Sequence, residues 1–157
     1  MRDSGLSTVR SVKHALAALT TNCAEFRRAW RAGQARAGQA SSRANDGLTG
    51  CWQGEWVSDV NGHRGPLCCV LVNQSNDRYR ASFHARYATI LRVCYSVDLE
   101  VTTEGSAKSL RGAADLGSLA GGRYEYEGHV AGSQWICNYR CKYDHGRFVL
   151  RKCPAPA

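Results

Sequence analysis

The chain has 157 residues, a length typical of a single domain. Its apolar fraction of 43% and charged fraction of 22% are ordinary for a globular protein, and no apolar run approaches the roughly 18 residues of a membrane-spanning helix. The formal net charge is +8, but residues 1–46 hold eight basic and three acidic residues, so most of the excess lies there. The remainder of the chain is nearly balanced and carries no strong signal for an acidic partner.

The N-terminal 46 residues are predicted to form a basic leader made of a helix and a flexible linker. Apolar residues recur at three- and four-residue spacing through residues 7–37, which is typical of a helix. Ser7 or Thr8 are candidates for its cap, and Gly33 is a candidate for its end. Residues 32–46 have no periodic apolar pattern and are rich in Gly, Ser, Gln and Arg, which predicts a linker. A domain boundary is therefore expected between residues 46 and 47.

The leader does not have the pattern of a signal peptide. The apolar run from His14 to Thr21 is short and ends in threonines, and Asn22 stands before Cys23 where a small residue would be needed. By default we expect a cytoplasmic location, with an extracytoplasmic one as the alternative. The eight cysteines leave both open, because they allow many disulfide pairings and also suit a core as small apolar residues.

From Leu48 onward the apolar period changes from that of a helix to that of a strand. The alternation between apolar and polar residues is cleanest in residues 78–86, 91–101 and 123–130. Turn residues separate these segments from five others that fit the same pattern less regularly, namely 50–58, 66–73, 107–116, 134–143 and 146–152. Eight short strands with short connections predict an all-β domain over residues 47–157.

An eight-stranded antiparallel up-and-down barrel is the expected architecture, because eight strands suffice to close a small barrel. The alternative is an open two-sheet sandwich. In either case one face of every strand points to a shared interior. The interior is expected to contain Trp56, Tyr79, Phe83, Tyr95, Tyr124, Tyr126 and Tyr139, together with small residues such as Ala81, Ala85, Gly112, Ala114 and Gly128.

This mixture of aromatic and small residues supports two different functions. Small residues opposite aromatic ones can leave a pocket, with tyrosine hydroxyls as polar contacts for a small apolar or aromatic ligand. The seven aromatic residues are then the predicted ligand-binding residues of a non-catalytic module. Alternatively, large and small side chains fill a narrow barrel completely, and the chain is a structural or protein-interaction domain.

The first and last strands resemble those of the calycins, meaning the lipocalins, fatty-acid-binding proteins and avidins. The resemblance rests on the Gly-x-Trp of Gly50-Cys51-Trp52 and on Arg151 in the final strand. It implies that Trp52 closes the base of the barrel and that Arg151 packs across it. The second lipocalin motif is absent and the biotin-contacting residues of avidins have no counterparts, so no particular ligand follows. Residues 50–151 are also similar to uncharacterised small bacterial proteins, which brings no activity.

Cys137, Cys141 and His145 have ligand types that suit zinc. On a strand, however, four residues span about 13 Å, so three such ligands lie too far apart to share an ion. No metal site and no cofactor are therefore predicted.

Catalysis is not expected either. Ser58, Ser82, Asp59, His63, Asp144 and His145 are the candidates for a hydrolytic triad, but no Gly-x-Ser-x-Gly segment positions a nucleophile. Asp and His beside Gly are also what turns use for their own hydrogen bonds. The chain is predicted not to be an enzyme.

Specific binding of nucleic acid is not expected. Arg78, Arg80 and Arg86 alternate with Tyr79 and Phe83, so the basic and aromatic groups lie on opposite faces of the strand. Stacking on bases needs both groups on one surface. The arginines are therefore assigned to a solvated outer face. The sequence contains no signal for an oligomeric state.

Overall fold

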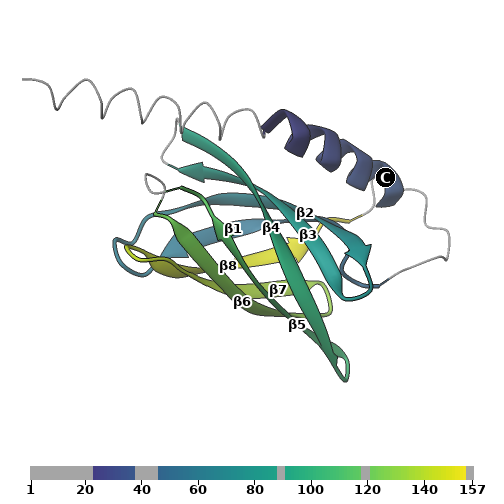
Figure 1. Ribbon diagram of the computed structural model, residues 1–157. Coiled ribbons are helices and arrows are strands. Elements are labelled where there is room, and N and C mark those ends of the chain that lie inside the picture. Colours follow the sequence, from purple (N-terminus) through teal and green to yellow (C-terminus); the bar gives the residue numbers. More distant parts are fainter. Residues whose placement is uncertain (1–22, 38–45, 88–90, 118–120, 155–157) are drawn as a thin grey trace, which may run out of the picture.

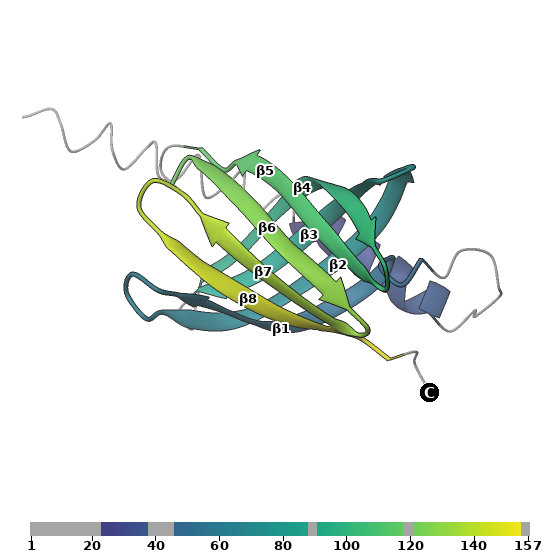
Figure 2. The ribbon, with the colours of Figure 1, turned by 90° about the horizontal axis from the view of Figure 1, so that it is seen from below.

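The computed structural model describes residues 23–37, 46–87, 91–117 and 121–154. In this part of the chain, eight antiparallel strands pair in sequence order and close into one barrel (Figures 1 and 2). The strands are β1 Gly50–Ser58, β2 Arg64–Ser75, β3 Arg78–Tyr87, β4 Leu91–Glu104, β5 Ala107–Asp115, β6 Arg123–Ala131, β7 Gln134–Arg140 and β8 His145–Lys152. Because β1 also pairs with β8, the predicted barrel is confirmed and the sandwich is wrong.

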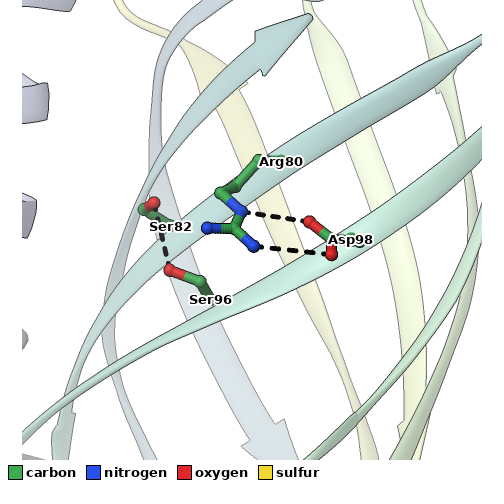
Figure 3. A network of polar contacts seen from close by, with 4 residues as sticks. All are labelled: Arg80, Ser82, Ser96 and Asp98. Carbon is green, nitrogen blue, oxygen red and sulfur yellow. Dashed lines mark hydrogen bonds and ion pairs between the residues drawn. The ribbon is translucent and has the colours of Figure 1, made fainter. Parts of the chain in front are cut away.

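Strand alternation sorts the side chains into an apolar interior and a charged exterior. On β3, Tyr79, Ala81 and Phe83 are buried in the core, whereas Arg80 points outward. Arg80 donates a hydrogen bond of 3.0 Å from Nε to Asp98 on β4, next to a contact between the hydroxyls of Ser82 and Ser96 (Figure 3). The predicted outward orientation of the arginines on β3 is confirmed. Arg78 and Arg80 pair with the carboxylates of Glu100 and Asp98 on β4.

Inward-facing glycines mark places where neighbouring strands come very close. A Cβ atom at Gly112 would lie 2.4 Å from the carbonyl oxygen of Asp98, and one at Gly128 would lie 2.3 Å from that of Ile136. Real Cβ atoms do not approach a backbone oxygen this closely. The two positions need glycine because backbone, rather than empty space, occupies the volume of a side chain. They therefore do not leave empty space in the barrel interior at the place of a side chain.

A helix covers the outer face of β1 to β4 (Figure 1). Its described residues are 23–37, so the prediction of a linker from residue 32 is wrong over residues 32–37. Gly33 does not end the helix. It lets the helix approach β1, since a Cβ atom there would lie 2.8 Å from Sγ of Cys51. The rest of the predicted leader, residues 1–22 and 38–45, lies outside the described residues.

Two kinds of contact hold the helix on the barrel. Phe26 is buried against Val70 and Cys51 in a cluster separate from the barrel core, and a disulfide joins Cys23 to Cys94 on β4. The predicted leader is therefore packed on the domain over its described helical part. No described helix has the length and apolar character needed to span a membrane.

Candidate functional site

One end of the barrel is closed by the segment that leads into β1. Trp52 is fully buried, and its indole Nε1 donates a hydrogen bond of 2.8 Å to the carbonyl oxygen of Leu48, which is also fully buried. The ring of Trp52 contacts that of Trp135 edge-on, with 6.0 Å between centroids. These side chains leave the closed end without an entrance for a ligand.

The expectation for Arg151 at this end is wrong. Arg151 is exposed on the outer face, whereas the ammonium of Lys152 lies 5.7 Å from the ring centroid of Trp52. The reason is strand register. Lys152 pairs directly with Trp52, so the two side chains share a face, and Arg151 pairs with Gln53 on the opposite face.

Asp46 is a structural residue of the closed end that the sequence analysis assigned to the linker. Its carboxylate accepts hydrogen bonds from the backbone N–H groups of Leu48 and Thr49 and from the hydroxyls of Thr49 and Tyr79, at 2.7–2.9 Å. Lys108 donates to its carbonyl oxygen. Burial alone would raise the pKa of Asp46, but these hydrogen bonds outweigh it and lower the pKa. The segment Asp46-Gly47-Leu48-Thr49, with Asp directly before Gly, is the sequence signal for such a turn.

Asp46 is expected to make stability depend on pH in the acid range. A carboxylate with a lowered folded-state pKa stabilises the fold above its unfolded pKa of about 4, and this contribution is lost as pH falls through the folded pKa. Asp46→Asn should therefore cost about 1 kcal/mol in urea unfolding at pH 7, and much less near pH 2. Asp77→Asn in an exposed turn is the control. An equal cost of Asp46→Asn at both pH values would contradict the assignment.

The opposite half of the barrel is open between β4 and β5. The ladder between these strands joins residues 98–104 to residues 107–113, although β4 already begins at Leu91. Residues 91–97 pair with β3 but have no ladder partner on β5 among the described residues. Figure 1 shows the two strands together at their shared turn and diverging away from it. The barrel wall is therefore incomplete beside the first half of β4.

Inward-facing side chains beside this opening are less buried than those of the closed half. Ala85, Tyr95, Ala114 and Tyr124 pack against the core but are only partly buried. Trp135, in contrast, is fully buried. Together, the partly buried residues come from β3, β4, β5 and β6, the strands next to the incomplete wall. We call this set the open half.

All seven aromatic residues predicted to bind a ligand face the interior, but they do not form one group. Phe83 stacks on Tyr95 with 5.1 Å between centroids and lies 6.2 Å from Tyr126. Tyr124 bridges Tyr126 and Tyr139, at 6.3 and 6.2 Å. The two others lie apart from this cluster. Tyr79 is hydrogen-bonded to Asp46 at the closed end, and Trp56 stacks on Tyr87 near the loops of the other end.

The tyrosine hydroxyls in and beside the open half are neutral. Burial is the main cause that raises the pKa of Tyr95, Tyr124, Tyr126 and Tyr139 far above the usual value. For Tyr139 the nearby carboxylate of Asp144 adds to the effect. Most of these hydroxyls already contact groups of the protein, because Tyr139 donates to Val57 and Asp144, Tyr124 interacts with Cys141, and Tyr126 interacts with Tyr95.

The candidates for a hydrolytic triad are only partly brought together. Ser58 donates a hydrogen bond of 2.6 Å to Asp144, which links the turn after β1 to the turn before β8. No histidine side chain of the described residues is hydrogen-bonded to the side chains of this pair. His63 bonds Ser58 only through its backbone carbonyl, and its Nδ1 lies 2.6 Å from the hydroxyl of Tyr87. Ser82 lies on the outer face (Figure 3). The Ser58–Asp144 pair acts as a tie between two loops.

The three residues considered for zinc are also dispersed. Cys137 is buried in the barrel core, whereas Cys141 is half-buried and interacts with the hydroxyl of Tyr124. His145 begins β8.

Exposed apolar side chains gather in the loops at the end of the barrel opposite the closed end, which we call the rim. The large hydrophobic residues that the described chain exposes are Val60, Tyr87, Leu91 and Tyr143, and all four lie in or beside the loops of this rim. Trp56 stacks on Tyr87 with 5.5 Å between centroids, so the aromatic surface continues from the rim into the barrel. The sequence analysis missed the rim because period-two patterning does not apply to loops.

A groove of about 820 Å³ lies on the outer face of the sheet and reaches Asp59 and His145 beside the rim. Its lining is dominated by charged side chains of β4, β5, β6 and β7, and several of these are already paired. Arg111 lies 2.6 Å from Glu127, and Arg140 lies 3.1 Å from Glu125. Because its charges compensate one another, this groove is a weaker candidate for a site than the open half.

No protein-family model and no curated protein sequence matches this chain. Two solved structures are similar in fold. Rv2717c from M. tuberculosis is 12% identical, with a TM-score of 0.48 and coverage of 68% of this chain and 92% of that chain. A point mutant of the fluorescent protein UnaG is 9% identical, with a TM-score of 0.40 and coverage of 70% and 99%. With both scores below 0.5, neither likeness supports an argument about function.

Proposed function

We propose that the chain is a non-catalytic binding module that holds a small, planar, apolar molecule in the open half of its barrel. The observation that carries the proposal is the missing ladder between β5 and residues 91–97 of β4, beside which inward-facing aromatic side chains remain partly buried. A hydrolytic triad needs its nucleophile in contact with a base, and the hydroxyl of Ser58 is instead hydrogen-bonded to the carboxylate of Asp144.

The chemistry of the open half defines the ligand class. The rings of Tyr95 and Tyr126 stack on Phe83, and the ring of Tyr124 stacks on Tyr126. Aromatic rings prefer to stack on flat, apolar partners, and neutral phenols donate hydrogen bonds. An aromatic molecule with a carbonyl or carboxylate acceptor meets both requirements.

A filled core with an interaction surface at the rim is the second candidate. The exposed side chains of Val60, Leu91 and Tyr143 favour it, since apolar groups clustered at one end of a domain commonly contact a partner. The two functions differ in where binding occurs. A ligand inside the barrel is blocked by an inward-facing substitution, whereas a protein partner is not.

The test uses two adjacent alanines of β5. Ala114→Phe fills the open half from the inside, while Ala113→Phe adds the same ring to the outer face, because side chains alternate along a strand. The probe is the fluorescent dye 1-anilinonaphthalene-8-sulfonate added to the folded full chain. We expect the wild type and Ala113→Phe to bind the dye alike, and Ala114→Phe to bind it at least tenfold more weakly.

Far-UV circular dichroism of both variants shows whether they fold. If folded Ala114→Phe binds the dye as the wild type does, the proposed site is wrong. Tyr143→Ser tests the second candidate. If Tyr143→Ser loses dye binding and Ala114→Phe does not, the dye binds the exposed apolar surface at the rim and not the barrel interior. Native mass spectrometry of the purified chain then identifies a ligand that stays bound.

A further inference from the structure

Five of the eight cysteines and one histidine gather beneath the helix, on the outer face of β1 to β4. The cysteines are Cys23, Cys51, Cys68, Cys94 and Cys153, and all belong to the cluster that the helix covers. His84 joins them through Phe26, whose ring stacks on the imidazole with 5.4 Å between centroids. Residues so distant in sequence meet here only because the barrel aligns their strands. This set is independent of the open half.

Three of these residues form a row across neighbouring strands. Cys68 on β2 pairs with His84 on β3, and His84 pairs with Cys94 on β4. Directly opposed residues on one face of a sheet have Cβ atoms about 5 Å apart. Cys23 approaches the row from the helix above and is bonded to Cys94. The ligand atoms of Cys23, His84 and Cys94 all lie within 4.8 Å of one another.

The ligand types and their surroundings suit a zinc ion. Thiolate sulfur and imidazole nitrogen are standard protein ligands of zinc, and three protein ligands with a water molecule in the fourth position are an established tetrahedral arrangement. Cys94 is 1% exposed and Cys23 is 8% exposed, so a bound ion would be shielded from water. The imidazole of His84 is half-buried beside the two sulfur atoms, so its ring nitrogen is placed to ligate the same ion.

We propose that, when the disulfide between Cys23 and Cys94 is reduced, Cys23, His84 and Cys94 bind one Zn²⁺ that fastens the helix to the barrel. A dithiol reductant supplies two electrons and two protons to the disulfide and is itself oxidised to a disulfide. The thiols of Cys23 and Cys94 then lose their protons to solvent as they bind the ion. The helix is thus held by a covalent bond under oxidising conditions and by a metal under reducing ones.

The test follows cobalt binding by the full chain. Protein reduced with a phosphine and freed of metal is titrated anaerobically with Co²⁺, and Zn²⁺ is then added to displace it. We expect one Co²⁺ per chain, with the intense visible bands of tetrahedral cobalt and a sulfur-to-cobalt charge-transfer band. The oxidised protein should show neither band.

Variants separate this site from other thiols of the cluster. His84→Ala should weaken Co²⁺ binding at least tenfold, whereas Cys68→Ser and Cys153→Ser, in the same cluster but outside the three ligands, should not change it. His84→Cys should restore tight binding with a stronger charge-transfer band, which shows that the chain is still folded.

Three results would overturn the proposal. The first is a Kd above about 1 μM for both Co²⁺ and Zn²⁺ in the reduced protein, because binding that weak also occurs at surface side chains. The second is unchanged binding in His84→Ala. The third is loss of binding in Cys153→Ser, which would move the ligands to the group of Cys51, Cys68 and Cys153.

Discussion

Phe83→Ala is expected to lower the free energy of unfolding by about 3–5 kcal/mol, the range seen when a large aromatic side chain is removed from a core. Phe83 is 1% exposed and occupies the centre of the barrel. Its ring lies 5.6 Å from that of Phe148 and 6.0 Å from that of Trp135, in addition to its contacts with Tyr95 and Tyr126. Because these partners come from four other strands, the cavity left by alanine cannot be filled by a local shift.

Urea denaturation at pH 7 measures this effect, and two variants frame it. Phe83→Leu keeps most of the volume and should cost about 1 kcal/mol. Tyr143→Ala removes an aromatic ring that is 67% exposed and should change stability by less than about 0.5 kcal/mol. If Phe83→Ala costs no more than Tyr143→Ala, the ring cluster around Phe83 is not the core of the fold.

The interior of the barrel was the most predictable feature of the chain. Period-two alternation assigns a face to each residue without knowledge of the partner strand, and the seven aromatic residues chosen on that basis all point inward. Alternation does not report distance, however. Gly112 and Gly128 were counted as spaces opposite aromatic rings, whereas neighbouring backbone fills those positions.

Features that depend on register or on packing between distant segments could not be predicted. The opening between β4 and β5 results from the stagger of two strands, and a sequence pattern does not contain that stagger. The same limit explains Arg151, because only the pairing of β1 with β8 shows that Lys152 shares the face of Trp52. The helix and its disulfide to β4 join residues 71 positions apart, which no local signal connects.

The second large effect is expected at that disulfide. Under oxidising conditions, Cys94→Ala should lower the free energy of unfolding by roughly 4 kcal/mol. The chain-entropy relation gives this magnitude for a crosslink spanning 71 positions, since the unfolded chain regains the freedom that the loop denied it. Guanidinium unfolding in a buffer with a metal chelator measures the effect, because the chelator prevents any ion from replacing the covalent bond.

A mutant cycle distinguishes loss of the crosslink from loss of two separate side chains. Cys23→Ala and Cys94→Ala each break the same bond, so the double variant should cost little more than either single one. Cys141→Ala, a half-buried cysteine that is not disulfide-bonded, should cost less than about 1 kcal/mol. Additive costs for Cys23→Ala and Cys94→Ala would mean that packing beneath the helix, rather than the covalent bond, holds it on the barrel. Phe26→Ala should then weaken the helix as much as either cysteine variant does.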